Sequence, residues 1–397
     1  MIRLSDRINR LSESETLAMS RMSRELKAEG HDVINLSVGE PDFFTPDLIK
    51  EAGRRAIDEN YSFYTPVNGY QDLREAICRK LLRDNNLHYT PDQVVVSTGA
   101  KQSIANAVLC LANPGDEVIV PAPYWVSYRE LVKMAEADAV YVKAGIESDF
   151  KITPQQLENA ITDKTRLFIF SSPCNPTGSV YSREELGELA EVFSKHPRIF
   201  IISDEIYEHI NFAGKHESIA RFDSIKDRVI LINGVSKGFA MTGWRLGYMA
   251  AHPQIAKACN KLQGQITSGT CSIAQRAALE AMEMDPSVTA GMLEKFRERR
   301  DLVIDLLREV PGITNNEPQG AFYLFINVKS YFGKSDGTET IQNDNDLCMY
   351  LLRKAHIALV PGSAFGDDEC VRFSYATSQD LLIEAVNRMK KALAILK

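Results

Sequence analysis

Short apolar runs recur along the first two thirds of the chain and alternate with amphipathic helical patterns. The runs are rich in β-branched residues and lack a regular polar alternation, as in strands that are buried on both faces. Six of them lie at 93–97, 117–120, 139–142, 166–170, 199–202 and 229–232. Turn signals such as Pro114-Gly115 separate these runs from the helical patterns. Residues 45–285 are therefore predicted to form a mostly parallel sheet with helices on both faces, a three-layer α/β/α arrangement.

The last third of the chain has a different pattern. A long, highly charged amphipathic stretch at 286–310 predicts a helix that links two domains. Apolar runs near 321–326 and 371–374, with helical patterns near 344–356 and 378–396, predict a smaller α/β unit. The segment 329–345 is polar and glycine-bearing, which indicates a surface loop. A chain of 397 residues exceeds the usual size of one core, so we predict a large domain (45–285) and a small domain (1–44 plus 286–397).

The composition is that of an ordinary soluble globular protein, with 44% hydrophobic and 25% charged residues. A net charge of −7 without a basic block argues against nucleic acid as the main partner. Early charges do not fit a signal peptide, and no apolar run approaches the roughly 18 residues of a membrane span. We expect a cytoplasmic protein whose seven scattered cysteines are reduced core thiols. The histidines show no metal-binding spacing, so no catalytic metal is expected.

A lysine follows the last of the predicted strands. The run at 229–232 leads into Ser236-Lys237-Gly238, and a glycine-containing turn then reaches Arg245. Open α/β sheets bind ligands at the carboxyl ends of their strands. A lysine held partly out of water can condense with a carbonyl group, while a hydroxyl and a guanidinium beside it suit a phosphate. A surface lysine in a loop is the alternative interpretation.

Two further loops also follow predicted strands. Ser97-Thr98-Gly99-Ala100 opens a helix, where free N–H groups and small residues can form a phosphate cradle. Ordinary strand–helix turns contain the same residue types. Asn175 lies in a rigid turn beside Pro176, and its amide could donate to a phenolate oxygen or a carboxylate. A plain Asn-Pro turn is the alternative.

A third loop carries a carboxylate and a phenol. Asp204 follows the run at 199–202, and a carboxylate there can hold the proton of a pyridinium ring. Tyr207 lies three residues further on and can donate to a phenolate. Glu205 is interpreted as a solvated or structural acid. With the phosphate cradle and the lysine, these groups meet the demands of pyridoxal 5′-phosphate, in which a protonated ring withdraws electrons from the substrate.

At this point the chain resembles the fold type I, class I pyridoxal-phosphate-dependent aminotransferases, in particular the bacterial aspartate aminotransferases of the subgroup with thermophilic members. The resemblance runs from Ser14 to the final helix and is carried by the lysine motif, by Asn175-Pro176-Thr177-Gly178 and by Asp204-Glu205-Ile206-Tyr207. It implies that Lys237 binds the cofactor covalently and shuttles the proton, and that Asp204 pairs with the pyridine nitrogen.

The resemblance also assigns the other cofactor contacts. Asn175 and Tyr207 bind the ring oxygen, and Trp125 stacks on the ring. Tyr64 is similar to a tyrosine that crosses a dimer interface to the neighbouring phosphate, which implies a homodimer. The phosphate itself is held by Thr98, Gly99, Ala100, Ser236 and Arg245.

On the substrate side, Arg372 interrupts a strand-like apolar run. A half-buried arginine needs an anion, and its fork suits a carboxylate; an internal ion pair is the alternative. The resemblance matches Arg372 to the arginine that binds the substrate α-carboxylate, with help from Asn175 and the backbone of Gly39. Lys101 matches a residue that helps to bind the distal carboxylate of aspartate or glutamate.

The N-terminal segment is similar to one that folds over the substrate, with Ser14 and Thr16 in it. Some relatives that accept prephenate have a lysine where this chain has Ser12. Glu13 and Glu15 either bring negative charge near the anion site or face solvent. The resemblance implies ping-pong transfer of the amino group of aspartate to 2-oxoglutarate. Aromatic, alanine or prephenate specificity, or carbon–sulfur lyase activity, are the alternatives on the same fold.

Two other classes of protein fit the sequence poorly. A cofactor-sensing transcription regulator needs a DNA-binding domain, and the expected fold already occupies 14–397. A nicotinamide dehydrogenase needs a GxGxxG motif after its first strand, and the sequence has none there.

Overall fold

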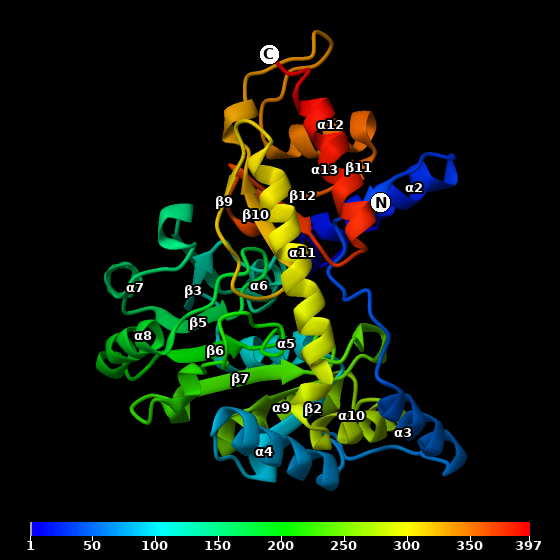
Figure 1. The fold of residues 1–397 in the computed structure, drawn as a ribbon. Helices are drawn as coiled ribbons and strands as arrows, with labels where there is room; N and C mark the ends of the chain where they lie inside the picture. The colour runs from blue at the N-terminus through cyan, green and yellow to red at the C-terminus, as the bar shows by residue number, and fades with distance from the viewer. Residues whose placement is uncertain (1) are drawn as a thin grey trace.

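The computed structural model describes residues 2–397, and a seven-stranded mixed sheet forms its central layer (Figure 1). The strand order is β2-β8-β7-β6-β5-β3-β4. The six predicted strands are confirmed. The seventh, β8, was not predicted, and it runs antiparallel to both of its neighbours, β7 and β2. The strands are β2 (Val94–Ser97), β3 (Glu117–Ala122), β4 (Asp138–Lys143), β5 (Thr165–Ser171), β6 (Phe200–Asp204), β7 (Val229–Gly234) and β8 (Gly247–Ala250).

Helices cover both faces of this sheet, as the apolar runs predict. Successive strand residues point to opposite faces, so Val94 and Val96 pack in one core while Val95 packs in the other. The first core contains residues of α3 (Asp47–Asp58), α4 (Gln71–Asn85), α7 (Pro154–Ala160), α8 (Arg183–Lys195) and α10 (Ser272–Glu283). The second contains residues of α5 (Ala100–Leu111), α6 (Ser127–Met134) and α9 (Pro253–Ile266). The three-layer α/β/α fold class is therefore confirmed.

The long helix α11 (Ala290–Arg308) runs from the level of the large sheet to a second group of elements (Figure 1). It begins four residues later than predicted because Pro286–Thr289 form a 3-10 turn. The second group is built around an antiparallel sheet in the order β12-β13-β10-β9. Its elements are β9 (Thr314–Asn315), β10 (Tyr323–Asn327), β12 (Val360–Pro361), β13 (Cys370–Ser374), α12 (Asp344–Ala355) and α13 (Gln379–Leu393).

The N-terminal segment joins this second group. Strand β1 (Ile34–Asn35) pairs in parallel with β11 (Ile357–Ala358), and Met19 of α2 (Glu15–Ala28) lies in the same apolar core as α13. A short helix α1 (Asp6–Asn9) precedes them. This pairing agrees with a small domain made from both ends of the chain, although the boundaries at 44/45 and 285/286 stay a prediction. The remaining 3-10 helices lie at Pro91–Gln93, Ile146–Ser148, Ile219–Arg221, Lys226–Arg228, Thr242–Trp244, Lys329–Tyr331 and Gly362–Phe365.

The predicted surface loop at 329–345 is only partly a surface loop. Tyr331 and Ile341 are 3% and 1% exposed and belong to the core around α12. Two isolated apolar residues carry no period, which is why the sequence pattern did not reveal these two anchors. The seven cysteines are all free thiols, and Cys271 is exposed, in contrast to the expected core position.

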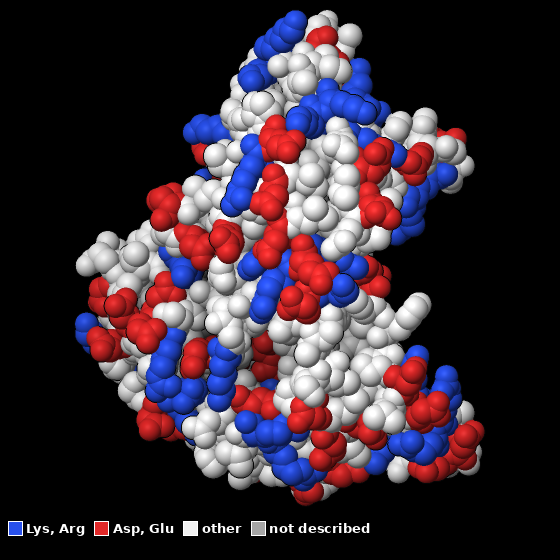
Figure 2. All heavy atoms as spheres, in the orientation of Figure 1, with Lys and Arg blue, Asp and Glu red and all other residues white. Residues whose placement is uncertain are grey.

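Charges of both signs are interspersed over the face shown in Figure 2. Within residues 2–397, no helix is both long and apolar enough to cross a bilayer. The same residues contain no cluster of three or more histidine, cysteine, aspartate or glutamate side chains that could hold a metal ion.

Candidate active site

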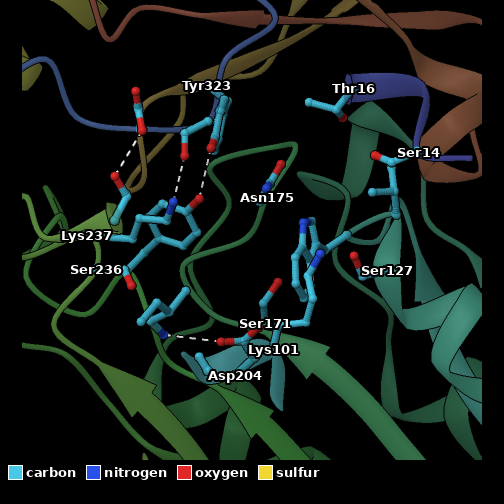
Figure 3. A pocket seen from close by; sticks show the side chains of 18 of the residues that line it. Ser14, Thr16, Lys101, Ser127, Ser171, Asn175, Asp204, Ser236, Lys237 and Tyr323 are labelled. Atoms are coloured by element: carbon cyan, nitrogen blue, oxygen red, sulfur yellow. Dashed lines mark hydrogen bonds between the residues drawn. The ribbon is translucent and has the colours of Figure 1, made fainter. Parts of the chain in front are cut away.

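A cavity of about 400 Å³ lies at the carboxyl ends of the large sheet, and residues of the antiparallel sheet and of the N-terminal segment complete its wall (Figure 3). The ends of β5 and β6, the turn after β7 and the start of α5 all reach it. Among the residues that the sequence singled out, eleven line it: Gly39, Ala100, Lys101, Trp125, Asn175, Asp204, Tyr207, Ser236, Lys237, Arg245 and Arg372. Ser14 and Thr16 line it as well.

Lys237 lies three residues beyond β7, with its amine inside the cavity. Its Nζ donates a hydrogen bond of 2.6 Å to the carbonyl oxygen of Gly39 and lies 5.8 Å from the centre of the Tyr207 ring. Burial lowers the pKa of Lys237 to about 8, while Glu40 opposes this shift. A larger fraction of the amine is therefore neutral near physiological pH than for an ordinary lysine, as a carbonyl-directed nucleophile requires.

Asp204 is the last residue of β6, and its carboxyl group is buried. The hydroxyl of Tyr128 donates to Oδ2 at 2.7 Å, and the backbone N–H of Ile206 donates to Oδ1 at 3.3 Å. Burial raises the pKa of Asp204 to about 6, and the Tyr128 hydrogen bond acts against that rise. A carboxylate with this affinity for a proton can share one with a heteroaromatic ring nitrogen.

Arg372 on β13 is 2% exposed, and its guanidinium faces the cavity. Nη1 donates to Oδ1 of Asn175 at 3.0 Å, and Nη2 donates to the carbonyl oxygen of Ser37 at 2.7 Å. The guanidinium also lies over the rings of Tyr323 and Phe365, at 4.5 and 4.9 Å from their centres.

Both hydrogen-bond partners of Arg372 are neutral. Within residues 2–397, Arg372 forms no ion pair: its hydrogen bonds go to Asn175 and Ser37, and its buried Nε has no partner. The internal ion pair that the sequence left open is therefore absent from this part of the chain. A buried cation without a counter-charge is costly unless an anion is bound, so the geometry favours a bound carboxylate.

The hydroxyl of Tyr207 lies 2.9 Å from that of Tyr323, and both side chains are buried. Burial raises the pKa of Tyr207 well above its usual value and raises that of Tyr323 as well. Both phenols are therefore neutral and able to donate. Because Oδ1 of Asn175 accepts from Arg372, the NH₂ group of this amide remains as a donor.

The start of α5 and Arg245 form a compact cradle. Gly99 precedes the helix with φ +84°, and a Cβ added there would lie 2.5 Å from Nη2 of Arg245. Arg245 itself has φ +54°, and its Nη1 donates to the carbonyl oxygen of Thr242 at 2.9 Å. Thr98 bonds to Thr270 at 3.2 Å between the hydroxyls. Helix N–H groups, small residues and a guanidinium are the chemistry of a phosphate site.

Lys101 and Trp125 meet at another part of the wall. The Nζ of Lys101 lies 5.0 Å from the centre of the Trp125 ring, and burial followed by the charge of Arg245 lowers its pKa. Ser14 and Thr16 line the same cavity as Lys101 and Trp125, and Figure 3 shows both of them near Ser127.

The two acids of the N-terminal segment are paired with arginines. Glu15 forms an ion pair with Arg129 at 3.3 Å, and Glu13 forms one with Arg21 at 3.8 Å. Neither acid lines the cavity. Their negative charges are thus partly neutralised away from the site, which removes the conflict that the sequence suggested.

Four of the residues that the sequence singled out do not line the cavity. Tyr64 is 99% exposed and lies outside the cavity of this single chain. Thr98 and Gly99 are not part of the cavity wall, although Gly99 touches Arg245. Glu205 is a structural acid, buried and bound to Ser203, Ser218 and His216.

Sequence reasoning did not single out several wall residues, among them Tyr128, Tyr323, Glu40 and Thr242. Tyr128 follows Trp125 by three residues, and this spacing could have indicated that the two side chains point to the same side of the chain. Tyr323 lies on β10 opposite β13, and that pairing is not readable from the sequence.

The residues present fit pyridoxal 5′-phosphate by their chemistry. The NH₂ group of Asn175 with the hydroxyl of Tyr207, the cradle at Gly99 and Arg245, and the buried Asp204 match its ring oxygen, phosphate and ring nitrogen, respectively.

The comparisons with known proteins agree with this geometry. The family model described as aminotransferase class I and II matches residues 31–389. A bifunctional aspartate aminotransferase and glutamate/aspartate-prephenate aminotransferase of Petunia hybrida is 50% identical, over 100% of this chain and 84% of that protein. An aspartate/prephenate aminotransferase of Cereibacter sphaeroides is 47% identical over 98% of both chains.

Solved structures lead to the same family. The aspartate aminotransferase of Rhizobium meliloti has a TM-score of 0.97 and 40% identity, and the match covers 100% of both chains. The aspartate aminotransferase of Thermus thermophilus with maleate has a TM-score of 0.92 and 37% identity, covering 99% of this chain and 100% of that one. The chain therefore belongs to the aminotransferase class I and II family and is a pyridoxal-phosphate-dependent aminotransferase.

Proposed function

We propose that the enzyme transfers the amino group of aspartate to 2-oxoglutarate in a ping-pong reaction. The single observation that carries this proposal is the pair of cations in one cavity. Arg372 is buried without a counter-charge among residues 2–397, and Lys101 contributes a second cation to the wall beside Trp125. Lys237 and Arg245 also line the cavity of about 400 Å³ but are assigned to the cofactor, so the other two cations suit a small dicarboxylate.

The relatives support the same substrate class. Several carry aspartate in their printed names, and the Thermus thermophilus structure was determined with maleate, which is itself a dicarboxylate. In the proposed arrangement, Arg372 binds the α-carboxylate through its fork, with Asn175 and the backbone of Gly39 beside it. Lys101 binds the distal carboxylate, while Ser14 and Thr16 cover that end of the cavity.

The same proposal assigns the cofactor contacts. Asp204 pairs with the ring nitrogen, Asn175 and Tyr207 with the ring oxygen, and Trp125 with the ring face. The phosphate is assigned to Thr98, Gly99, Ala100, Ser236 and Arg245. When bound, the cofactor acts as an electron sink that makes the α-proton of the amino acid labile.

Lys237 is the group that binds the cofactor and moves the proton. Its Nζ accepts the α-proton, and the pKa of about 8 leaves part of the amine neutral near physiological pH. Asp204 holds the positive charge of the ring nitrogen through the reaction. The buried phenols of Tyr207 and Tyr323 and the apolar wall exclude water from the proton transfer.

A homodimer is part of this proposal. Phe44, Phe63 and Tyr64 are 94%, 82% and 99% exposed, which is unusual for aromatic side chains and favours burial against a second copy. Tyr64 then reaches the partner's phosphate site. We also propose a cytoplasmic location, because seven free thiols suit a reducing compartment.

Prephenate transamination is a second candidate, because a relative that is 47% identical over 98% of the chain carries both substrates in its name. Prephenate has two carboxylates as well, so the same pair of cations suits it. Ser12, the position at which some prephenate-accepting relatives have a lysine, is not part of the cavity wall; its backbone N–H donates to Glu130 at 2.9 Å.

The experiment is a set of half-reactions. The visible absorbance of the bound cofactor is followed after adding one amino acid without an oxoacid. Aspartate and glutamate are expected to convert the cofactor to its amino form, whereas alanine and phenylalanine do so at least tenfold more slowly. Lys101→Gln should reduce this preference, and Lys257→Gln, an exposed lysine on α9, is the control. Faster conversion by alanine or phenylalanine would discard the dicarboxylate proposal and leave the family unchanged.

A further inference from the structure

Tyr128 forms the shorter of the two hydrogen bonds to the Asp204 carboxyl group, and the proposed function gives it no role. It lies in the first turn of α6 and is 1% exposed. Its hydroxyl donates to Oδ2 of Asp204 at 2.7 Å. Within residues 2–397, no other side chain forms a hydrogen bond with this carboxyl group, and only the N–H of Ile206 reaches Oδ1, at 3.3 Å.

The position of Tyr128 is well defined. Its ring meets the ring of Trp125 edge-to-face with the centres 5.5 Å apart. Trp125 lies two residues before α6, and the backbone N–H of Tyr128 donates to its carbonyl oxygen at 2.9 Å. This turn into α6 connects the residue assigned to the face of the cofactor ring with the donor to Asp204.

The surroundings contain an incompletely bonded hydroxyl. Ser171 at the end of β5 is the register partner of Asp204 on β6, and its buried Oγ has no partner within residues 2–397. Figure 3 shows Ser171 and Asp204 at the same end of the cavity. Ser171 therefore does not replace the hydrogen bond that Tyr128 supplies.

We propose that Tyr128 is a positioning residue that keeps Asp204 ionised and aimed at the cofactor ring nitrogen. This inference rests on the proposed role of Asp204. A hydroxyl donor stabilises a carboxylate more than a neutral acid, because hydrogen bonds to ionised acceptors are the stronger ones. It also leaves one face of the carboxylate free for a second partner, since each oxygen has a single protein donor.

The surroundings of Asp204 have opposing effects on its pKa. Burial raises its pKa to about 6, and the Tyr128 and Ile206 hydrogen bonds lower it; Glu205 raises it and Lys237 lowers it. Loss of the Tyr128 hydroxyl removes the hydrogen bond that does most to lower the pKa of Asp204 against the effect of burial. The pKa of Asp204 then rises towards or above neutrality, and a neutral acid no longer holds a positive charge on the ring nitrogen.

The test compares Tyr128→Phe with Tyr350→Phe. Both changes remove one buried hydroxyl, but Tyr350 lies in α12, donates to the carbonyl oxygen of Ala392 at 3.1 Å and is not part of the cavity wall. In cofactor-free protein, the ionisation of the Asp204 carboxyl is followed by infrared difference spectroscopy, with Asp204→Asn identifying its band. Tyr128→Phe is expected to raise the midpoint by about one pH unit, and Tyr350→Phe to leave it unchanged.

Kinetics of the cofactor-loaded enzyme give the second readout. Tyr128→Phe should lower kcat about tenfold and change KM for aspartate less than twofold, since the substrate-binding groups are untouched. In an Asp204→Asn background, the same change should have less than a twofold effect, because Tyr128 acts through Asp204.

The outcomes separate the inference from the function. Unchanged ionisation of Asp204 in Tyr128→Phe, or an equal kinetic loss in both backgrounds, overturns the role of Tyr128. If Asp204→Asn itself retains full activity, the proposed role of Asp204 fails first. A wild-type enzyme that does not transaminate aspartate would reject the substrate proposal but would leave the infrared result intact.

Discussion

Replacement of Arg372 by methionine should separate activity from stability. The guanidinium uses two of its five N–H groups, on Asn175 and Ser37, and three remain for a substrate carboxylate. Two charge-assisted hydrogen bonds of roughly 1.5–3 kcal/mol each amount to about 3–6 kcal/mol. Arg372→Met is therefore expected to lower kcat/KM for aspartate by about 10²- to 10⁴-fold.

The same change should leave the folded protein almost as stable as before. Methionine removes an uncompensated buried charge, whose desolvation costs several kcal/mol, and leaves two neutral acceptors unsatisfied at about 1–3 kcal/mol each. These effects nearly cancel. At roughly 2.1 cal/mol/K per residue, 1 kcal/mol corresponds to about 1.2 °C for this chain length, so Tm should change by less than about 3 °C.

Arg299→Met is the matched control. Arg299 is similarly buried, but it pairs with both oxygens of Asp42 at 2.7 and 2.9 Å. Asp42 is partly exposed, so losing the pair should cost about 1–3 kcal/mol and lower Tm by about 1–4 °C. The assays are steady-state kinetics and thermal unfolding. A kcat/KM loss below tenfold in Arg372→Met would refute the carboxylate role, and a Tm loss above about 6 °C would make Arg372 structural.

Three other changes test separate parts of the structure. Gly99→Ala introduces a Cβ against Arg245 at a positive φ, and cofactor titration should show at least about tenfold weaker binding; unchanged affinity would exclude the cradle. Glu208→Leu leaves Lys80 buried and should cost about 3 kcal/mol, or about 4 °C in Tm, most of which Lys80→Met restores. Although burial acts against it, the charge of Lys80 holds the pKa of Glu208 well below its usual range, so this stabilisation is present above about pH 5 and is lost as pH falls below it. Tyr64→Phe should weaken cofactor binding about tenfold in the dimer. Equal cofactor affinity in Tyr64→Phe and the unchanged protein would show that Tyr64 does not contact the partner's phosphate site.

Local patterns predicted most of the large sheet. The six apolar runs became strands because parallel strands buried on both faces need continuous β-branched residues, and this requirement is visible in the sequence. Strand β8 escaped prediction because its four residues include glycine and follow a turn at Arg245. Helix α11 was predicted from its charged, amphipathic pattern, but its start depended on the turn at Pro286.

The residues of the candidate site also fall into two groups, those that the sequence pattern predicted and those that it did not. Lys237, Asp204 and Asn175 stand at a strand end or within four residues of one, so their convergence follows from the sheet. Tyr128 and Tyr323 meet their partners Asp204 and Tyr207 only through packing between segments far apart in the chain, which the sequence pattern does not show. The lack of a counter-charge at Arg372 could not be predicted from the sequence. The absence of a carboxylate partner within residues 2–397 is a property of the folded chain.

The central claim is that Lys237 holds the cofactor, and chemical trapping tests it most directly. The cofactor-loaded protein is reduced with borohydride, which fixes pyridoxal phosphate to the lysine that binds it, and the modified peptide is identified by mass spectrometry. One stoichiometric modification at Lys237 is expected, and none in Lys237→Ala. Stoichiometric modification of another lysine, such as Lys101, would contradict it.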